Sequence, residues 1–239
     1  MKKRKLIYVN ANHETHEFIY TGIEFCEFVK YLQSPMENIL LLKSNYIGNN
    51  FSNNFELAEG LREIETLAKA NIYNCGNFCF VDYTQPGDID NLSDAEIAEI
   101  LYLAHLYKPL KSPFYKVLNN RFAYLAHDDG FFCKLYCQNS DDFLDILDGK
   151  IVELTKAIAK RSIQNLSRSL KKDLLRFAGD GMLLDLEDLE MNDDEILINI
   201  YIIGKHGDMD KVFNERQSFK ENSLSQHCMK YKTDKWHLV

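Results

Sequence analysis

The sequence predicts an α+β protein, with a mixed or antiparallel sheet of about six strands, packed helices and a mainly helical C-terminal part. Two observations lead to this prediction. Short β-branched and aromatic runs, separated by turn residues, fill the chain as far as Gln138. Beyond that point apolar residues recur at helical spacing, and the last proline is Pro113. We expect an α+β domain at 1–148 and a helical part at 149–239, which can share one core.

Composition and charge limit the classes of function. The chain has 239 residues, of which 46% are hydrophobic and 27% charged, as in globular proteins. Its net charge of −8 argues against binding to nucleic acid, which depends largely on Lys and Arg. No apolar run of about 18 residues occurs, and no signal-peptide core follows the basic start of the chain. We therefore expect a cytoplasmic protein that does not enter a membrane.

The first elements predicted are a hairpin, a helix and a strand. Leu6–Asn10 and Glu17–Thr21 are expected to pair around a short connection. Residues 23–33 carry apolar side chains on one helical stripe, and Pro35 ends that helix. Asn38–Lys43 is apolar and short, which favours a buried strand.

A loop, a helix and another strand follow. The asparagine-rich stretch 44–54 is expected to be a loop. A helix is predicted to begin at Phe55, because Leu57, Leu61 and Ile64 recur at helical spacing. Asn77–Tyr83 is the next strand.

The next helix has the clearest boundaries. Ser93 and Glu96 have the spacing of a capping box, and Pro109 ends the helix. Between Ile97 and Tyr107 nearly every face is apolar, so we expect this helix to be buried between layers.

A hairpin is predicted over Arg121–Cys137, around the turn Asp128-Asp129-Gly130. Two registers are possible. One pairs Leu125 with Cys133, and the other places Lys134 opposite Leu125 on the apolar face. We prefer the first, because a slip of one residue exchanges the faces of a strand.

In the C-terminal part the sequence predicts a long amphipathic helix at 150–177 and a second helix at 193–203. A strand is the alternative at Ile196–Ile203, where β-branched residues are frequent. The stretch Ile198–Phe213 resembles the turn region of a pentatricopeptide or tetratricopeptide repeat, and the resemblance implies a helical hairpin. We expect about the last 20 residues to be weakly ordered.

Charges are segregated in this part of the chain. Residues 156–176 contain seven basic side chains and one acid, whereas 180–195 contain eight acids and no base. A basic amphipathic helix can bind an acidic partner protein. The simpler interpretation is that the two runs neutralise each other within the chain.

One group of residues could form a ligand-binding cleft. His105 lies in an apolar helix, and His127, Asp128 and Asp129 lie at the mouth of the predicted hairpin. An imidazole beside carboxylates can act as a general base with an orienting group. The competing interpretation is structural, because Asp-Asp-Gly is also ordinary turn chemistry.

The cysteines do not predict a metal site. Two Cys-x3-Cys pairs fall in strand-like sequence, where four residues span roughly 13 Å and cannot share one zinc ion. The common phosphate-binding, dinucleotide-binding and hydrolase motifs do not occur. We predict six free thiols, no metal and no cofactor.

The sequence thus favours a non-catalytic intracellular protein, for interaction or regulation, that binds another protein through its C-terminal helices and the basic helix 156–176. The alternative is a small enzyme or small-ligand-binding protein that uses a cleft formed by His105, His127, Asp128 and Asp129. The two hypotheses differ in whether the histidines converge on a pocket. The partner, any reaction and the oligomeric state cannot be predicted from the sequence.

Overall fold

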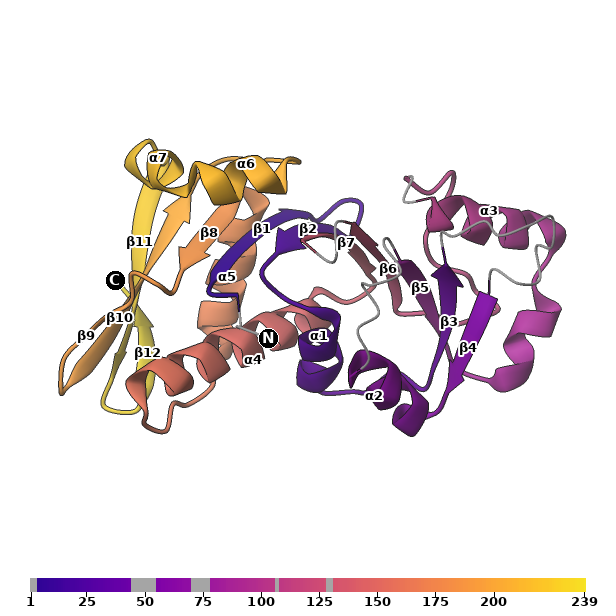
Figure 1. The fold of residues 1–239 in the computed structure, drawn as a ribbon, viewed down its shortest axis with the longest axis horizontal. Coiled ribbons are helices and arrows are strands. Elements are labelled where there is room, and N and C mark those ends of the chain that lie inside the picture. Colours follow the sequence, from indigo (N-terminus) through magenta and orange to yellow (C-terminus); the bar gives the residue numbers. More distant parts are fainter. Residues whose placement is uncertain (1–3, 44–54, 70–77, 106–107, 128–130) are drawn as a thin grey trace. The chain divides into compact units, whose positions relative to one another are not determined.

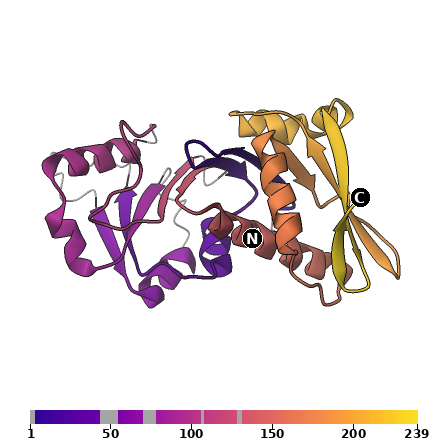
Figure 2. The same cartoon turned by 180° about the vertical axis from the view of Figure 1, so that it is seen from behind.

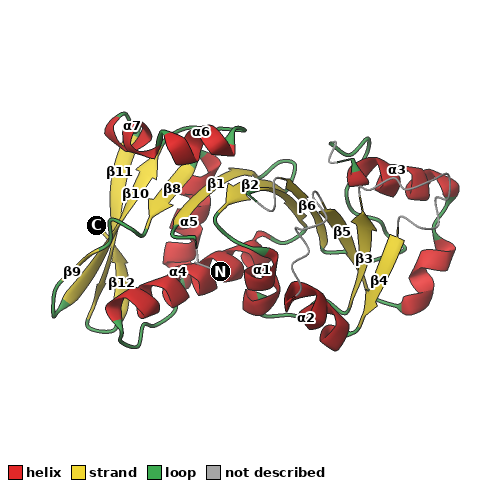
Figure 3. Ribbon diagram, in the orientation of Figure 1, coloured by secondary structure: helices red, strands yellow, loops and turns green. Residues whose placement is uncertain are grey.

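The computed structural model describes residues 4–43, 55–69, 78–105, 108–127 and 131–239 (Figure 1). Within these ranges the chain forms a sheet of twelve strands in antiparallel pairs, and 37% of the part that the structure describes is helical. The prediction of about six strands followed by a mainly helical C-terminal part is therefore wrong. The C-terminal part also contributes five strands, β8–β12, which all lie after residue 181 (Figure 3).

The chain divides into two compact units. The first unit comprises residues 1–14, 18–23 and 143–239, and the second comprises 15–17 and 24–142. The N-terminal strands thus belong to the same unit as the C-terminal half of the chain.

In the second unit the strand order is β7-β6-β5-β3-β4. The bounds are β3 Asn38–Lys43, β4 Phe55–Glu59, β5 Phe78–Tyr83, β6 Phe122–His127 and β7 Phe132–Cys137. The helices are α1 Phe25–Tyr31, α2 Leu61–Lys69 and α3 Asp94–Ala104, with a 3-10 helix at Pro86–Asn91.

The sheet of the second unit is covered on both faces (Figures 1 and 2). On one face, the Phe28 ring of α1 contacts Phe80 and Tyr124 at centroid distances of 6.0 and 5.4 Å. On the other face, Ile100 and Leu103 of α3 belong to the core cluster that includes β5 and β6 side chains. Both sides of β6 are consequently buried.

This double burial explains why the predicted hairpin register is wrong. Leu125 pairs with Lys134, and Ala126 pairs with Cys133. The preferred register assumed that a slip would exchange a buried face for an exposed one. Because β6 is buried on both faces, that exchange would expose nothing. Lys134 is partly exposed, so its long side chain can reach water.

The predicted helix from Phe55 is also corrected. Phe55–Glu59 forms the strand β4 on β3, and the helix α2 starts only at Leu61. Gly60 separates them with a φ of 78°, a conformation that favours glycine. Its N–H donates to Glu37 O and to Asn38 Oδ1, which fixes the corner.

In the first unit the strand order is β12-β11-β10-β8-β1-β2, with β9 beside β10. The bounds are β1 Leu6–Asn12, β2 Glu17–Thr21, β8 Met182–Asp185, β9 Glu190–Met191, β10 Glu195–Ile202, β11 Ser225–Lys232 and β12 Lys235–Leu238. The helices are α4 Ser140–Ala159, α5 Arg168–Gly179, α6 Met209–Asn214 and α7 Arg216–Glu221.

The long helix predicted at 150–177 is two helices. The chain leaves α4 at Lys160, which has a left-handed φ of 54°. In the loop that follows, Leu166 N donates to the buried Asp148 of α4 at 2.9 Å. Ser167 then caps α5 by accepting from Leu170 N.

The helix predicted at 193–203 is the strand β10. Its side chains alternate between buried and partly exposed, as expected for a strand. The strand that the β-branched residues offered as the alternative is therefore the one that forms. The helical hairpin implied for Ile198–Phe213 is therefore wrong, because this stretch holds the end of β10, a turn and α6.

The C-terminal end of the chain is an ordered hairpin, contrary to the expectation of weak order. The Trp236 ring of β12 packs against the Tyr231 ring of β11 at a centroid distance of 5.0 Å, with the ring planes tilted by 55°. The indole N–H donates to Gln164 O at 2.8 Å, and the Tyr231 hydroxyl accepts from Gln164 N at 3.2 Å. The hairpin thereby holds the loop between α4 and α5.

Candidate functional site

The predicted histidine cleft has only one member whose surroundings are described. His105 is exposed, so the prediction that it is buried is wrong. Helix α3 ends at Ala104, and His105 forms its C-cap with its N–H donating to Tyr102 O at 3.1 Å. His127 is the last residue of β6, and its side chain lies outside the described residues, as do Asp128 and Asp129.

The described cysteines are free thiols: Cys26, Cys79, Cys133, Cys137 and Cys228. Cys79, Cys133 and Cys137 are buried, and burial raises the pKa of the Cys79 thiol far above its usual range. In the parts of the chain that the structure describes, no group of three or more His, Cys, Asp or Glu side chains could hold a metal ion. Cys75 lies outside those parts.

The acidic run 180–195 finds its counter-charges in α7 and β11. Lys220 forms ion pairs with both Asp185 and Asp188. Lys220 is 8% exposed and Asp185 only 2%, so this pair is buried. Burial lowers the pKa of Lys220, but the hydrogen bonds that its ammonium donates to both carboxylates outweigh that effect and leave the pKa raised.

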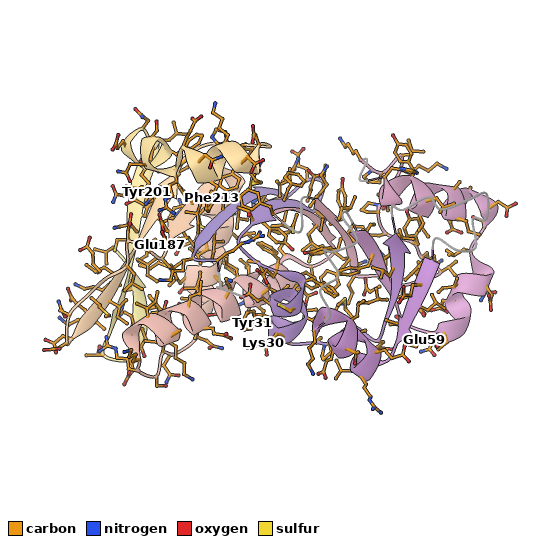
Figure 4. All side chains as sticks on the ribbon, viewed as in Figure 1. Lys30, Tyr31, Glu59, Glu187, Tyr201 and Phe213 are labelled. Carbon is orange, nitrogen blue, oxygen red and sulfur yellow. The ribbon has the colours of Figure 1, made fainter. Side chains whose placement is uncertain are left out.

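A second cation of α7 completes this ionic cluster. Arg216 Nη2 lies 3.0 Å from Glu187 Oε2, and its guanidinium lies 6.0 Å from the centre of the Phe213 ring. The centre of the Tyr201 ring lies 5.9 Å from Lys220 Nζ. Glu187, Phe213 and Tyr201 are labelled in Figure 4. At the other end of the run, Glu195 pairs with cations of β11, and the closer of them is Lys230 at 2.8 Å.

The interpretation that the basic and acidic runs neutralise each other is therefore wrong for the described ion pairs. The backbone is the reason, because α7, from later in the chain, brings Lys220 to Asp185 and Asp188. Sequence analysis missed Lys220 and Arg216, because they lie more than 20 residues beyond the acidic run. One signal in the sequence pointed to them: the run 180–195 has eight acids and no base, so cations from another part of the chain are needed to neutralise it.

The basic run lies on the end of α4, the following loop and α5. Helix α5 turns Leu170, Leu174 and Phe177 inward. The side chain of Lys171 reaches α4, where its Nζ lies 2.8 Å from Asp145 Oδ1 and 2.7 Å from Asp148 Oδ2. These contacts fix α5 on α4.

Four basic side chains of the run face solvent and form no ion pair with the described residues: Lys156, Lys160, Arg168 and Lys172. We call these four the basic surface. Arg168 and Lys172 are one helical turn apart on α5. Lys156 lies in the last turn of α4, and Lys160 directly follows the end of that helix. Arg176, also exposed, is already paired with Asp173 at 3.4 Å.

None of the described helices is long and apolar enough to cross a bilayer. No known protein family, curated protein or solved structure matches the chain, so the geometry alone supports a function.

Proposed function

We propose that this protein is a non-catalytic binding protein that holds an acidic segment of a partner protein on the basic surface of α4 and α5. The observation that carries the proposal is that Lys156, Lys160, Arg168 and Lys172 are exposed without an ion pair among the described residues. Four acids of the run 180–195 are engaged by α7 and β11: Asp185, Glu187, Asp188 and Glu195.

The position of Arg168 and Lys172 strengthens this argument. Both belong to the first turns of α5, where the aligned peptide dipoles add partial positive charge. Lys171 and the buried apolar residues hold the helix from its other side, so its exposed face is rigid. A rigid cationic face suits an acidic peptide better than it suits an apolar one.

Net charge makes the binding local. The chain carries −8 overall, and exposed charges are screened beyond about 8 Å in physiological salt. An acidic partner is therefore repelled by most of the molecule and attracted at the basic surface. We place the protein in the cytoplasm as part of this proposal, because no disulfide joins the cysteines that the structure describes.

The proposal is tested with a short glutamate-rich peptide as probe, titrated against the whole protein. We expect saturable binding that weakens as salt rises. The variant Arg168→Glu/Lys172→Glu should weaken binding by about tenfold or more, since each exposed ion pair contributes roughly 0.2–1 kcal/mol and reversal adds repulsion. The matched control is Lys69→Glu/Lys108→Glu, which makes the same change of charge at exposed positions of the second unit.

Two outcomes contradict the proposal. Equal losses in the two double variants would mean that only net charge matters. Tighter binding of single-stranded DNA than of the glutamate-rich peptide, abolished by Arg168→Glu/Lys172→Glu, would assign the surface to nucleic acid instead.

A further inference from the structure

A cavity of about 740 Å³ lies in the second unit, between the exposed side of α3 and the segment 110–116. Its size is within the range of roughly 300–1,000 Å³ that is typical of small-ligand sites. The apolar part of its lining comes from Ala95, Ala98, Tyr102, Leu110 and Phe114. Ala95, Ala98 and Tyr102 are exposed, and Leu110 is 70% exposed. The prediction that this helix is buried between layers is therefore wrong, because this side of α3 is exposed and lines a cavity.

The segment opposite α3 is held in place by a buried amide. Asn120 is 1% exposed, and its Oδ1 accepts from Tyr115 N at 2.6 Å. Its Nδ2 donates to Pro113 O at 2.9 Å. The Phe114 ring is also in edge contact with the His16 ring, at a centroid distance of 6.3 Å. This wall of the cavity is therefore formed before any ligand arrives.

The two acids of the cavity are already engaged by the protein. Glu96 Oε2 accepts from the backbone N–H and the hydroxyl of Ser93, at 2.8 and 2.6 Å. Glu99 Oε1 accepts from Lys111 N. These carboxylates hold the start of α3 and the segment 110–116, and they offer little to a ligand.

The groups left for a ligand are donors. Lys111 and Lys116 line the cavity, are exposed, and form no side-chain ion pair with the residues that the structure describes. The Tyr115 hydroxyl is buried, with the residue 5% exposed, and has no hydrogen-bond partner among the described residues. Burial, with Glu99 and other nearby groups, raises its pKa, so the hydroxyl stays protonated and can donate.

We propose that this cavity binds a small amphipathic carboxylate. The apolar body of the ligand lies against Ala98, Tyr102 and Phe114, and its carboxylate meets Lys111 and Lys116 at the rim. The Tyr115 hydroxyl supplies a hydrogen bond from the wall. A buried donor without a partner is costly to a folded protein, which is why a ligand oxygen is the expected acceptor.

The test compares octanoate with octylammonium and octanol, three probes with the same chain and different head groups. Titration calorimetry on the whole protein should show saturable binding of octanoate, at least about tenfold tighter than that of the other two. Ala98→Trp should abolish this binding by filling the cavity, and the exposed position of Ala98 lets the variant fold. Tyr115→Phe should weaken it while leaving thermal stability unchanged or higher, because the hydroxyl has no partner to lose.

Charge-reversal variants distinguish the effect of the rim lysines, Lys111 and Lys116, from the effect of the protein's net charge. Lys111→Glu/Lys116→Glu should lose octanoate and gain affinity for octylammonium. The control Lys69→Glu/Lys108→Glu should keep the preference of the wild type. Equal binding of the three probes, or no binding of octanoate, would overturn the proposal. Binding of the glutamate-rich peptide should not respond to Ala98→Trp, so this site and the basic surface are tested separately.

Discussion

At the scale of single residues, the buried carboxyl of Asp82 sets a pH dependence of stability. Its Oδ1 accepts from Arg121 N at 3.0 Å and from Phe122 N at 2.7 Å. Burial nevertheless raises its pKa from 3.8 to about 6. A raised pKa means that the folded protein holds this proton more tightly than the unfolded chain does. The stabilisation is complete below about pH 4 and is lost as pH rises through about 6.

We therefore expect Asp82→Asn to remove this pH dependence. The amide oxygen can accept the same two N–H groups without burying a charge. At pH 7 the variant should be more stable by up to about 3 kcal/mol, from two pKa units at about 1.4 kcal/mol each. Urea unfolding between pH 4 and pH 7 measures the difference. Parallel curves for the two proteins would show that Asp82 titrates normally.

A second prediction at this scale concerns Lys220. Removing its charge in Lys220→Met leaves the buried Asp185 with Arg216, 4.0 Å away, as its one remaining ion-pair partner among the described residues. We expect a loss of about 3–5 kcal/mol in the free energy of unfolding, as for other buried pairs that lose one partner. Lys220→Met/Asp185→Asn should recover part of the loss, because no uncompensated charge remains. A double variant as unstable as the two single changes added together would contradict this coupling.

At the scale of elements, the sequence predicted correctly those elements that depend on a few neighbouring residues. It did not predict those that depend on pairing with distant parts of the chain. The capping box of α3 is confirmed, since Ser93 and Glu96 bond reciprocally within three residues. The strands β1, β2 and β3 were also predicted, from patterns of a few residues each. By contrast, β10 is a strand because it pairs with β8 and β11, and no window of local sequence contains those partners.

The candidate site divides in the same way. The basic run was visible in the sequence, and so were the acids behind it. Their actual partners are set by the path of the chain, which brings α7 to β8. The Lys160 break between α4 and α5 was missed because a left-handed lysine has no clear sequence signal, although Ser167 is an ordinary N-cap residue.

The prediction at this scale concerns the start of α3. Ser93→Ala removes the oxygen that accepts from Glu96 N and should cost about 1 kcal/mol of stability. Thermal melts measure the loss, and Ser93→Asp, which can still cap the helix, is the matched control. An unchanged melt for Ser93→Ala would show that the capping box contributes nothing to stability.

At the scale of the whole molecule, the path of the chain bears on cooperativity. It passes between the two units at 14/15, 17/18, 23/24 and 142/143. In a protein whose chain crosses once between two units, one unit can unfold while the other stays folded. Here the residues of the first unit come from three separate segments, so opening the second unit releases chain that the first unit needs. We infer that the two units unfold together.

Trp236 makes this inference measurable. It is the one tryptophan of the chain, is 6% exposed, and belongs to the first unit, whereas Asp82 belongs to the second. We expect Asp82→Asn to raise the melting temperature seen by tryptophan fluorescence as much as that seen by far-UV circular dichroism. Coincident transitions are the signature of one cooperative step. A fluorescence transition that stays at the wild-type temperature, while circular dichroism resolves a second and later step, would mean that the two units unfold independently despite the repeated passages.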